Sequence, residues 1–149
     1  MSARTPCVVT LMFVPGVPES VWLSERTGTN AFVGYWQGGG GRLEKDKGPL
    51  QPAEGPVAGA LRELREEAGI DGYKRLVYLG CDREAIASDG GVFPLHYFII
   101  KLEPGEVPQN TEPELHGPWT QFTREQTAKL KLMPGLAHKW FKRWIDFRR

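Results

Sequence analysis

The sequence predicts an α+β fold, in which a mixed β-sheet lies between helices. Short runs of apolar, β-branched and aromatic residues, among them Cys7–Phe13 and Val92–Leu102, predict strands. An amphipathic helical pattern over Gly55–Ala68 falls between them, an order of elements that favours a sheet covered by helices. Because 149 residues is the size of one domain, we expect residues 1–149 to form a single domain.

Composition and charge exclude several classes of protein. Hydrophobic residues make up 40% and charged residues 25%, which excludes a disordered or collagen-like chain. The formal net charge is +1, so no global field attracts nucleic acid or a membrane. Cys7 and Cys81 lie far apart and predict neither a disulfide framework nor a zinc knuckle. No apolar run approaches the roughly 20 residues of a membrane helix, and the run Cys7–Val14 is short for a signal peptide. We therefore expect a cytoplasmic protein with no membrane partner and no stable nucleic-acid partner.

The first 36 residues predict three strands separated by turns. The strands are Cys7–Phe13, Ser20–Glu25 and Ala31–Trp36. Prolines and a glycine within residues 15–18 predict the first turn, and residues 27–30 the second. We expect the first two strands to pair as a hairpin.

A glycine- and proline-rich stretch follows. Of the 26 residues from Gly34 to Gly59, 11 are Gly or Pro, and residues 38–41 are four successive glycines. One interpretation is a flexible surface loop. The other is backbone that approaches a phosphate or a metal closely, since glycine has no side chain.

The helix predicted over Gly55–Ala68 has recognisable ends. Pro56 suits its first position, and Gly69 suits the left-handed residue just beyond its end. On a helical wheel Val57, Leu61, Leu64 and Ala68 form one apolar stripe, which predicts the buried face.

The last third of the chain predicts two more strands, a loop and two helices. These are strands Lys74–Cys81 and Val92–Leu102, a loop over Glu103–Pro118, and helices Thr123–Leu130 and Leu136–Phe147. The continuous apolar run within the second of these strands predicts burial on both faces. The final helix combines aromatic and basic residues, which favours packing on its own domain over binding to a membrane or nucleic acid.

Three glutamates fall together on the side of the first helix opposite its apolar stripe. Glu63, Glu66 and Glu67 are spaced three and four residues apart, so their carboxylates lie within mutual reach. Glu63 and Glu67 are a like-charged i,i+4 pair, which destabilises a helix by about 0.2–0.5 kcal/mol. Glu66 and Glu67 also lie in the last turn, where the helix dipole disfavours negative charge. A divalent cation would remove both penalties, because hard cations prefer carboxylate oxygens. The alternative is a solvated acidic face with an ordinary Arg62–Glu66 ion pair.

The segment from Gly48 to Ile70 resembles the signature of the Nudix (MutT-like) hydrolases. It reads Gly48-x5-Glu54-x7-Arg62-Glu63-Leu64-x-Glu66-Glu67-x-Gly69-Ile70 and matches that signature at every defined position. The resemblance implies an α/β/α sandwich with a mixed sheet between helices. It also implies hydrolysis of a nucleoside diphosphate linked to another group, with Mg²⁺ or Mn²⁺ as cofactor.

The resemblance further implies roles for the matching residues. Glu66 and Glu67 would bind the metal, and Glu63 would be a further ligand or the base that deprotonates water. Arg62 would orient these glutamates by ion pairing. Glu54 would brace the junction between the loop and the helix.

One departure from the family pattern precedes the helix. Trp36–Glu44 resembles the usual lead-in, but an extra stretch of about Lys45–Gln51 follows it before Glu54. Gly48 satisfies the spacing of the signature, whereas Gly41 is the alternative structural equivalent. In that case the carbonyl of Gly40 or Gly41 would bind the metal, and the inserted stretch is a candidate flap over the substrate.

Further charged residues are candidates for substrate or metal contacts. Glu112 and Glu114 lie in a later loop from which family members often supply another carboxylate, and the alternative for both is solvated charge. Arg26 and Arg42 are candidates for phosphate binding, with surface charge as the alternative. Glu44, two residues after Arg42, is a further candidate for substrate binding.

Aromatic and histidine residues give weaker signals. Five aromatic residues either stack on a base or pack in the core: Trp22, Tyr35, Trp36, Phe93 and Tyr97. His96 lies in an apolar strand and is predicted to be a core residue. His116 and His138 show no ligand pattern.

The leading functional hypothesis is a metal-dependent pyrophosphohydrolase. Nucleoside triphosphates, oxidised ones included, are the favoured substrates, because no downstream proline or tyrosine has the spacing associated with ADP-ribose or dinucleoside polyphosphate cleavage. Those two classes, nucleotide sugars and capped RNA remain alternatives. A non-catalytic nucleotide sensor is the second hypothesis, although such a sensor is expected to lose at least one of the glutamates. Prenyl diphosphate isomerisation is disfavoured, because no cysteine–glutamate catalytic pattern is visible. A homodimer is possible, since dimers are common in the family.

Overall fold

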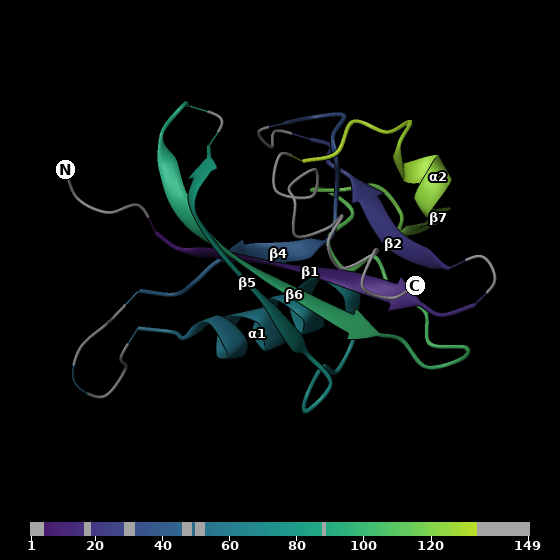
Figure 1. Ribbon diagram of the computed structural model, residues 1–149, viewed down its shortest axis with the longest axis horizontal. Coiled ribbons are helices and arrows are strands. Elements are labelled where there is room, and N and C mark those ends of the chain that lie inside the picture. Colours follow the sequence, from purple (N-terminus) through teal and green to yellow (C-terminus); the bar gives the residue numbers. More distant parts are fainter. Residues whose placement is uncertain are drawn as a thin grey trace.

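The computed structural model describes residues 5–16, 19–28, 32–45, 49, 53–87 and 89–133. Within these residues the elements are β1 (Cys7–Val14), β2 (Ser20–Glu25), β3 (Trp36–Gln37), β4 (Gly39–Arg42), α1 (Pro56–Ala68), β5 (Val77–Ile86), β6 (Val92–Lys101), β7 (Thr120–Thr123) and α2 (Arg124–Thr127). Figure 1 shows α1 lying along one side of the strands and the short α2 beside β7.

The strands form one mixed sheet with β1 at its centre. The order is β3-β2-β1-β6-β5, with β4 also paired to β1 and β7 to β2. β1 pairs with β6 in parallel, whereas its pairings with β2 and β4 are antiparallel. The predicted hairpin of the first two strands and the mixed sheet are therefore confirmed.

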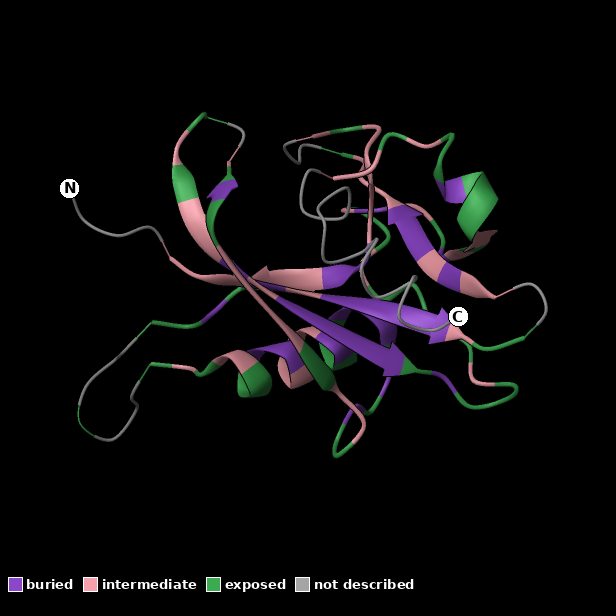
Figure 2. Cartoon of the chain, in the orientation of Figure 1, coloured by how far each residue is buried: buried purple, intermediate pink, exposed green. Residues whose placement is uncertain are grey.

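Both faces of the central strands are buried. Along β1, Met12 packs with Leu64 and Ala68 of α1, whereas Leu11 and Phe13 point to a second cluster on the other face of the sheet. β6 alternates in the same way, since Ile100 belongs to the α1 cluster and Ile99 to the other. Figure 2 shows the resulting continuous buried zone through β1, β6 and the inner face of α1. The prediction that the strand over Val92–Leu102, here β6, is buried on both faces is confirmed.

The prediction of a strand over Ala31–Trp36 is wrong except at Trp36. Phe32 and Gly34 have φ angles of 59° and 89°, so the chain turns there, and only Trp36–Gln37 pairs with β2. The N–H of Gly34 donates to the carbonyl of Arg26, which holds the turn. The glycine run is not a flexible loop, because residues 39–42 form strand β4.

Two later elements have other boundaries than predicted, and one strand is new. β5 begins at Val77 rather than Lys74, because Lys74 has a φ of 62° within a turn. The predicted helix Thr123–Leu130 shortens to α2, with Thr123 as its N-cap. Strand β7 was not predicted. The predicted closing helix Leu136–Phe147 lies outside the described residues. In the described part of the chain, no helix has the length and apolar character needed to cross a membrane.

Candidate active site

Helix α1 carries most of the predicted site residues, and local signals fix its ends. Pro56 occupies the first turn, and Gly69 follows the last residue with a left-handed φ of 66°, as predicted. The buried face differs from the predicted stripe. Val57 is 55% exposed, whereas Leu64 and Ala68 are fully buried and Glu67 is only 6% exposed. The buried face has rotated to include a glutamate, because β4 covers that side of the helix.

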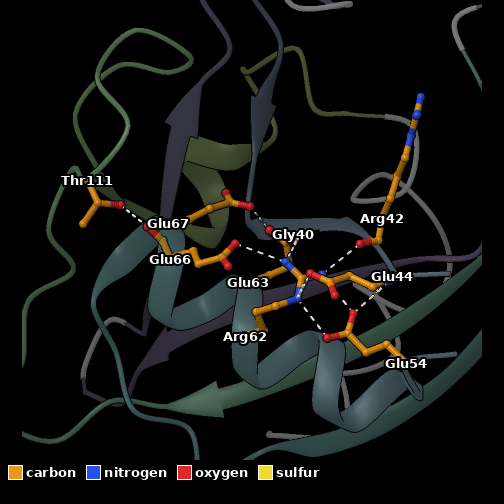
Figure 3. Close-up of polar contacts among 9 residues, drawn as sticks. All are labelled: Gly40, Arg42, Glu44, Glu54, Arg62, Glu63, Glu66, Glu67 and Thr111. Atoms are coloured by element: carbon orange, nitrogen blue, oxygen red, sulfur yellow. Dashed lines mark hydrogen bonds and ion pairs between the residues drawn. The ribbon is translucent and has the colours of Figure 1, made fainter. Parts of the chain in front are cut away.

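Arg62 is the centre of a network of ion pairs that joins α1 to the segment before it. Its guanidinium donates two hydrogen bonds to the Glu54 carboxylate, at 2.8 and 2.9 Å. It donates two more to Glu63 and Glu66, at 3.0 and 3.1 Å, and one to the carbonyl of Arg42. Figure 3 shows this fan of contacts. The Arg62 side chain thus fixes two helix glutamates relative to the loop that precedes the helix.

Glu54 and Glu44 complete that network. Glu54 also accepts a hydrogen bond from the backbone N–H of Glu44, at 3.0 Å. The Glu44 carboxylate lies 3.6 Å from Arg62. The Arg62 hydrogen bonds hold the pKa of Glu54 below its ordinary value. Glu44, which the sequence indicated as a candidate for substrate binding, therefore lies in the ion-pair network at the start of the helix.

Glu67 is a buried carboxyl group beside a second carboxylate. Burial raises its pKa well above the ordinary value, and hydrogen-bond contact with Glu63 raises the pKa further. One hydrogen bond opposes this, donated by the backbone N–H of Gly40 to Glu67 Oε1 at 3.2 Å. Two adjacent carboxyl groups with little access to water are a fit for a divalent cation, which supplies the missing positive charge.

The glycines of β4 allow this strand to reach the helix glutamates. A Cβ atom on Gly41 would collide with the carboxylate of Glu63, and one on Gly40 would collide with the backbone of β1. Gly39, at the start of the same strand, has space for a Cβ, with Leu64 at 3.8 Å as its nearest neighbour. Gly40 therefore places its backbone N–H against Glu67, and Gly41 lets the strand approach the Glu63 carboxylate closely.

The loop between β6 and β7 is tied to the C-terminal end of α1. Its donors satisfy three carbonyls of the last helical turn: the Thr111 hydroxyl bonds to Glu66, the Trp119 indole N–H to Glu67, and the Gln109 N–H to Ala68. These carbonyls have no partner within the helix itself. The three bonds hold the loop, and with it Glu112 and His116, beside Glu67.

Glu112 and His116 approach Glu67 closely. One ligand atom from each of the three side chains lies within 4.8 Å of the others. Burial and the charge of Glu63 raise the pKa of Glu112. The sequence predicted Glu112 as a candidate ligand but gave no ligand pattern for His116. The one signal in the sequence was that the two residues are four apart. In the structure the His116 N–H donates to the Glu112 carbonyl, and this turn brings residues of that spacing together.

A pocket of about 340 Å³ opens next to these carboxylates. Gly40 and Gly41 form part of its wall, so the pocket and the glutamates share the β4 backbone. Apolar side chains from the β5–β6 hairpin and β1 form most of the rest: Val9, Ala85, Ile86, Phe93 and Leu95. Arg26, Gln37, Asp82 and Glu84 supply its polar and charged groups. This composition suits a planar base with a charged group directed toward the glutamates.

The remaining predicted residues lie in different places. Arg26 is half-buried in the pocket wall, and its guanidinium donates a hydrogen bond to the Gln37 side chain at 2.6 Å. Burial lowers the pKa of Arg26, and the negative charge of Glu67 raises that pKa and so opposes the effect of burial. The Arg42 side chain is exposed, and Figure 3 shows it extending away from the glutamates. Glu114 is exposed and lies outside the Glu67 cluster. Gly48 and most of the inserted stretch fall outside the described residues.

The aromatic and histidine candidates separate into core and wall residues. Tyr97 is a core residue, and Trp36 is partly buried against a different core cluster, that of Leu11 and Phe13. Phe93 lines the pocket. His96 is partly exposed and contacts the Tyr78 hydroxyl at 3.0 Å, so it is not a fully buried core residue.

Comparisons with known proteins agree on one family. The family model described as NUDIX domain matches residues 4–143. No curated protein matches the sequence.

Solved structures with the same fold come from distant relatives. The NUDIX domain of Shewanella oneidensis NrtR complexed with ADP ribose is similar with a TM-score of 0.75 at 13% identity, covering 97% of this chain and 90% of that one. The MutT protein from Methanosarcina mazei Go1 gives 0.71 at 16% identity, covering 99% and 96%. A C. elegans Ap4A hydrolase gives 0.67 at 16% identity, covering 96% and 98%.

The family model spans nearly the whole chain, and solved structures of the same fold include Nudix proteins. The chain belongs to the Nudix family of pyrophosphohydrolases, which act on nucleoside diphosphate derivatives.

Proposed function

We propose that this protein hydrolyses the diphosphate linkage of a nucleoside diphosphate derivative with Mg²⁺, or Mn²⁺, bound to the glutamates of α1. The observation that supports this most is the contact between Glu63 and Glu67 against the β4 backbone, beside an apolar pocket. Bound there, a divalent cation neutralises phosphate charge and lowers the pKa of a water molecule.

The residues of the chain divide the remaining work. Glu63, Glu66 and Glu67 are the proposed ligands, with Gly41 or Gly40 as a backbone contributor, and Glu63 is also a candidate base. Arg62 is a positioning residue, because its guanidinium holds Glu63 and Glu66 while anchored to Glu54. Gly69 ends the helix immediately after these glutamates.

The pocket supports recognition of the nucleoside. Its apolar walls suit a base, and Arg26 lies where a phosphate passing from the pocket to Glu67 would meet a positive charge. We favour nucleoside triphosphates as substrates. ADP-ribose and dinucleoside polyphosphates are the principal alternatives, since proteins of the same fold carry ADP ribose or are named Ap4A hydrolase.

A panel of about twenty nucleotides, assayed with Mg²⁺ and with product identification, tests this proposal. We expect at least one to be cleaved at the diphosphate linkage, and Glu67→Gln to lower turnover about 100-fold or more while the fold persists. Glu103→Gln is the matched control, because Glu103 is exposed and remote from the pocket. Near-native turnover by Glu67→Gln would contradict the mechanism, and nucleotide binding without cleavage across the panel would favour a sensor.

A further inference from the structure

His116 is a buried histidine with one ring nitrogen that has no partner. Its side chain is only 2% exposed. Nδ1 lies 3.0 Å from the carbonyl oxygen of Gly117. Because a carbonyl only accepts, Nδ1 carries the proton and donates it there. Nε2, the other ring nitrogen, is buried and makes no hydrogen bond within the described residues.

A buried nitrogen without a partner lowers the stability of the fold unless a donor or a metal ion binds to it. A buried polar group without a partner has lost its hydrogen bonds to water and gained none in the protein, which destabilises the fold. A neutral ring presents a lone pair at Nε2, which is the form that binds metal ions.

Two carboxylates, those of Glu67 and Glu112, lie close to this ring. Ligand atoms of Glu67, Glu112 and His116 all lie within 4.8 Å of one another. Two carboxylates and one neutral imidazole carry a total charge of −2, which matches a divalent cation. The donor set contains both oxygen and nitrogen. Mg²⁺ favours an all-oxygen site, whereas imidazole is a better ligand for transition ions.

The ring is held rigidly in this position, as a metal ligand requires. It packs on Trp119 with ring centroids 5.3 Å apart. The Trp119 indole N–H in turn donates to the Glu67 carbonyl at 3.3 Å. The Nδ1–H bond to a backbone carbonyl fixes the tautomer, an arrangement common behind metal-binding histidines.

We infer that Glu67, Glu112 and His116 form a site for a divalent transition-metal ion, with Nε2 of His116 as a nitrogen ligand. The inference rests on the proposed function in that Glu67 belongs to both ligand sets. It adds that the site prefers a transition ion to Mg²⁺, and that one ligand comes from the loop between β6 and β7.

Mn²⁺ provides a spectroscopic test that does not depend on activity. We expect pulsed EPR of the Mn²⁺-loaded protein to show coupling to a ¹⁴N nucleus. Production with ¹⁵N-labelled histidine should replace it by ¹⁵N coupling, with no change in sequence. A spectrum without nitrogen coupling, or one that the label does not alter, would overturn the inference.

Variants then assign the coupling to one histidine. His116→Gln should abolish it and weaken Mn²⁺ binding about tenfold or more while changing Mg²⁺ binding little. His96→Gln is the control and should retain it, because His96 is bonded to Tyr78 on the sheet. Retained coupling in folded His116→Gln would also overturn the inference. If that variant does not fold, the labelled protein decides alone.

Hydrolysis measured in parallel separates the two proposals. Cleavage of nucleotides with Mg²⁺ but no histidine coupling would leave the proposed function standing and refute the nitrogen ligand. Histidine coupling without cleavage of any nucleotide would refute the proposed function and support the metal site.

Discussion

The backbone N–H of Gly40 donates a hydrogen bond to Oε1 of Glu67, 3.2 Å away and 27 residues along the chain. This bond joins the glycine strand β4 to the last turn of α1. It directs a buried carboxyl group toward Glu63, its nearest acidic neighbour on the helix. Two features that stand out in the sequence, the glycine run and the helix glutamates, therefore meet where Gly40 contacts Glu67 and Gly41 approaches Glu63.

Substitution of Gly41 tests the close approach of β4 to the helix. Gly41→Ala places a methyl group on the Glu63 carboxylate, which must then move. We expect kcat/KM to fall at least tenfold because the carboxylate loses its position. Gly39→Ala is the matched control in the same strand. Its Cβ meets only Leu64 at 3.8 Å, so activity should stay within about twofold of wild type. Equal effects of the two variants would contradict the account.

Arg62→Lys tests the forked geometry of the ion-pair network. Lysine keeps the charge but loses the planar fork that serves Glu54, Glu63 and Glu66 at once. We expect kcat to fall about tenfold, measured at saturating substrate. Arg75→Lys removes a similar fork to Glu106 away from the site. It should lower thermal stability without changing kcat. A kcat unaffected by Arg62→Lys would show that the network has no positioning role.

The Glu54–Arg62 pair predicts a stability effect with a defined pH dependence. The pKa of Glu54 in the folded protein lies below its ordinary value of 4.5, so its ionised form stabilises the fold. That stabilisation is present above pH 4.5 and is lost as the pH falls through the folded pKa. Glu54→Gln should lower the free energy of unfolding by about 1–2 kcal/mol at pH 7. The difference from wild type, followed by urea unfolding, should vanish in acid. A difference that grows in acid would contradict this assignment.

Removal of divalent cations should show that the buried Glu67 carboxyl group lowers the stability of the metal-free protein. In chelator at pH 7.5, this carboxyl group is either ionised without a counter-charge or takes up a proton, and both lower stability. Glu67→Gln should therefore melt a few degrees higher than wild type in chelator. Added Mn²⁺ should raise the melting temperature of wild type but have much less effect on the variant. Equal Mn²⁺ shifts for both proteins would place the cation elsewhere.

Narrowing the pocket should affect substrate binding more than chemistry. Ala85 forms part of its wall on the β5–β6 hairpin, and Ala85→Leu fills part of the space proposed for the base. We expect KM to rise about tenfold with kcat nearly unchanged, since the base lies away from the bond that breaks. Val92→Leu is the control on the same hairpin, because Val92 is exposed and outside the pocket. A fall in kcat alone would argue against this placement of the base.

Local signals predicted the helix and its two ends well. Pro56 and Gly69 act within one or two residues of themselves, and both helix ends were predicted correctly from the sequence. The spacing of Arg62 and Glu66 likewise anticipated their ion pair, because i,i+4 neighbours meet on any helix.

Features set by distant contacts were not predictable in this way. The burial of Glu67 depends on β4. At about 100° per residue this side chain lies at the edge of the apolar stripe, about 60° from Leu64, so the strand that covers that edge decides whether it is buried. The turn at Phe32 replaced a strand because backbone bonds to Arg26 outweigh the β propensity of the segment. His116 reaches Glu67 only because the loop between β6 and β7 bonds to the end of α1.

The most direct test of the central claim is anomalous diffraction from crystals soaked in Mn²⁺. We predict a peak within coordination distance of Glu67 and at least one other carboxylate at the end of α1. The same soak of Glu67→Gln crystals should give a weaker peak or none. A wild-type map with no anomalous peak beside Glu63 and Glu67, even with nucleotide present, would contradict the account.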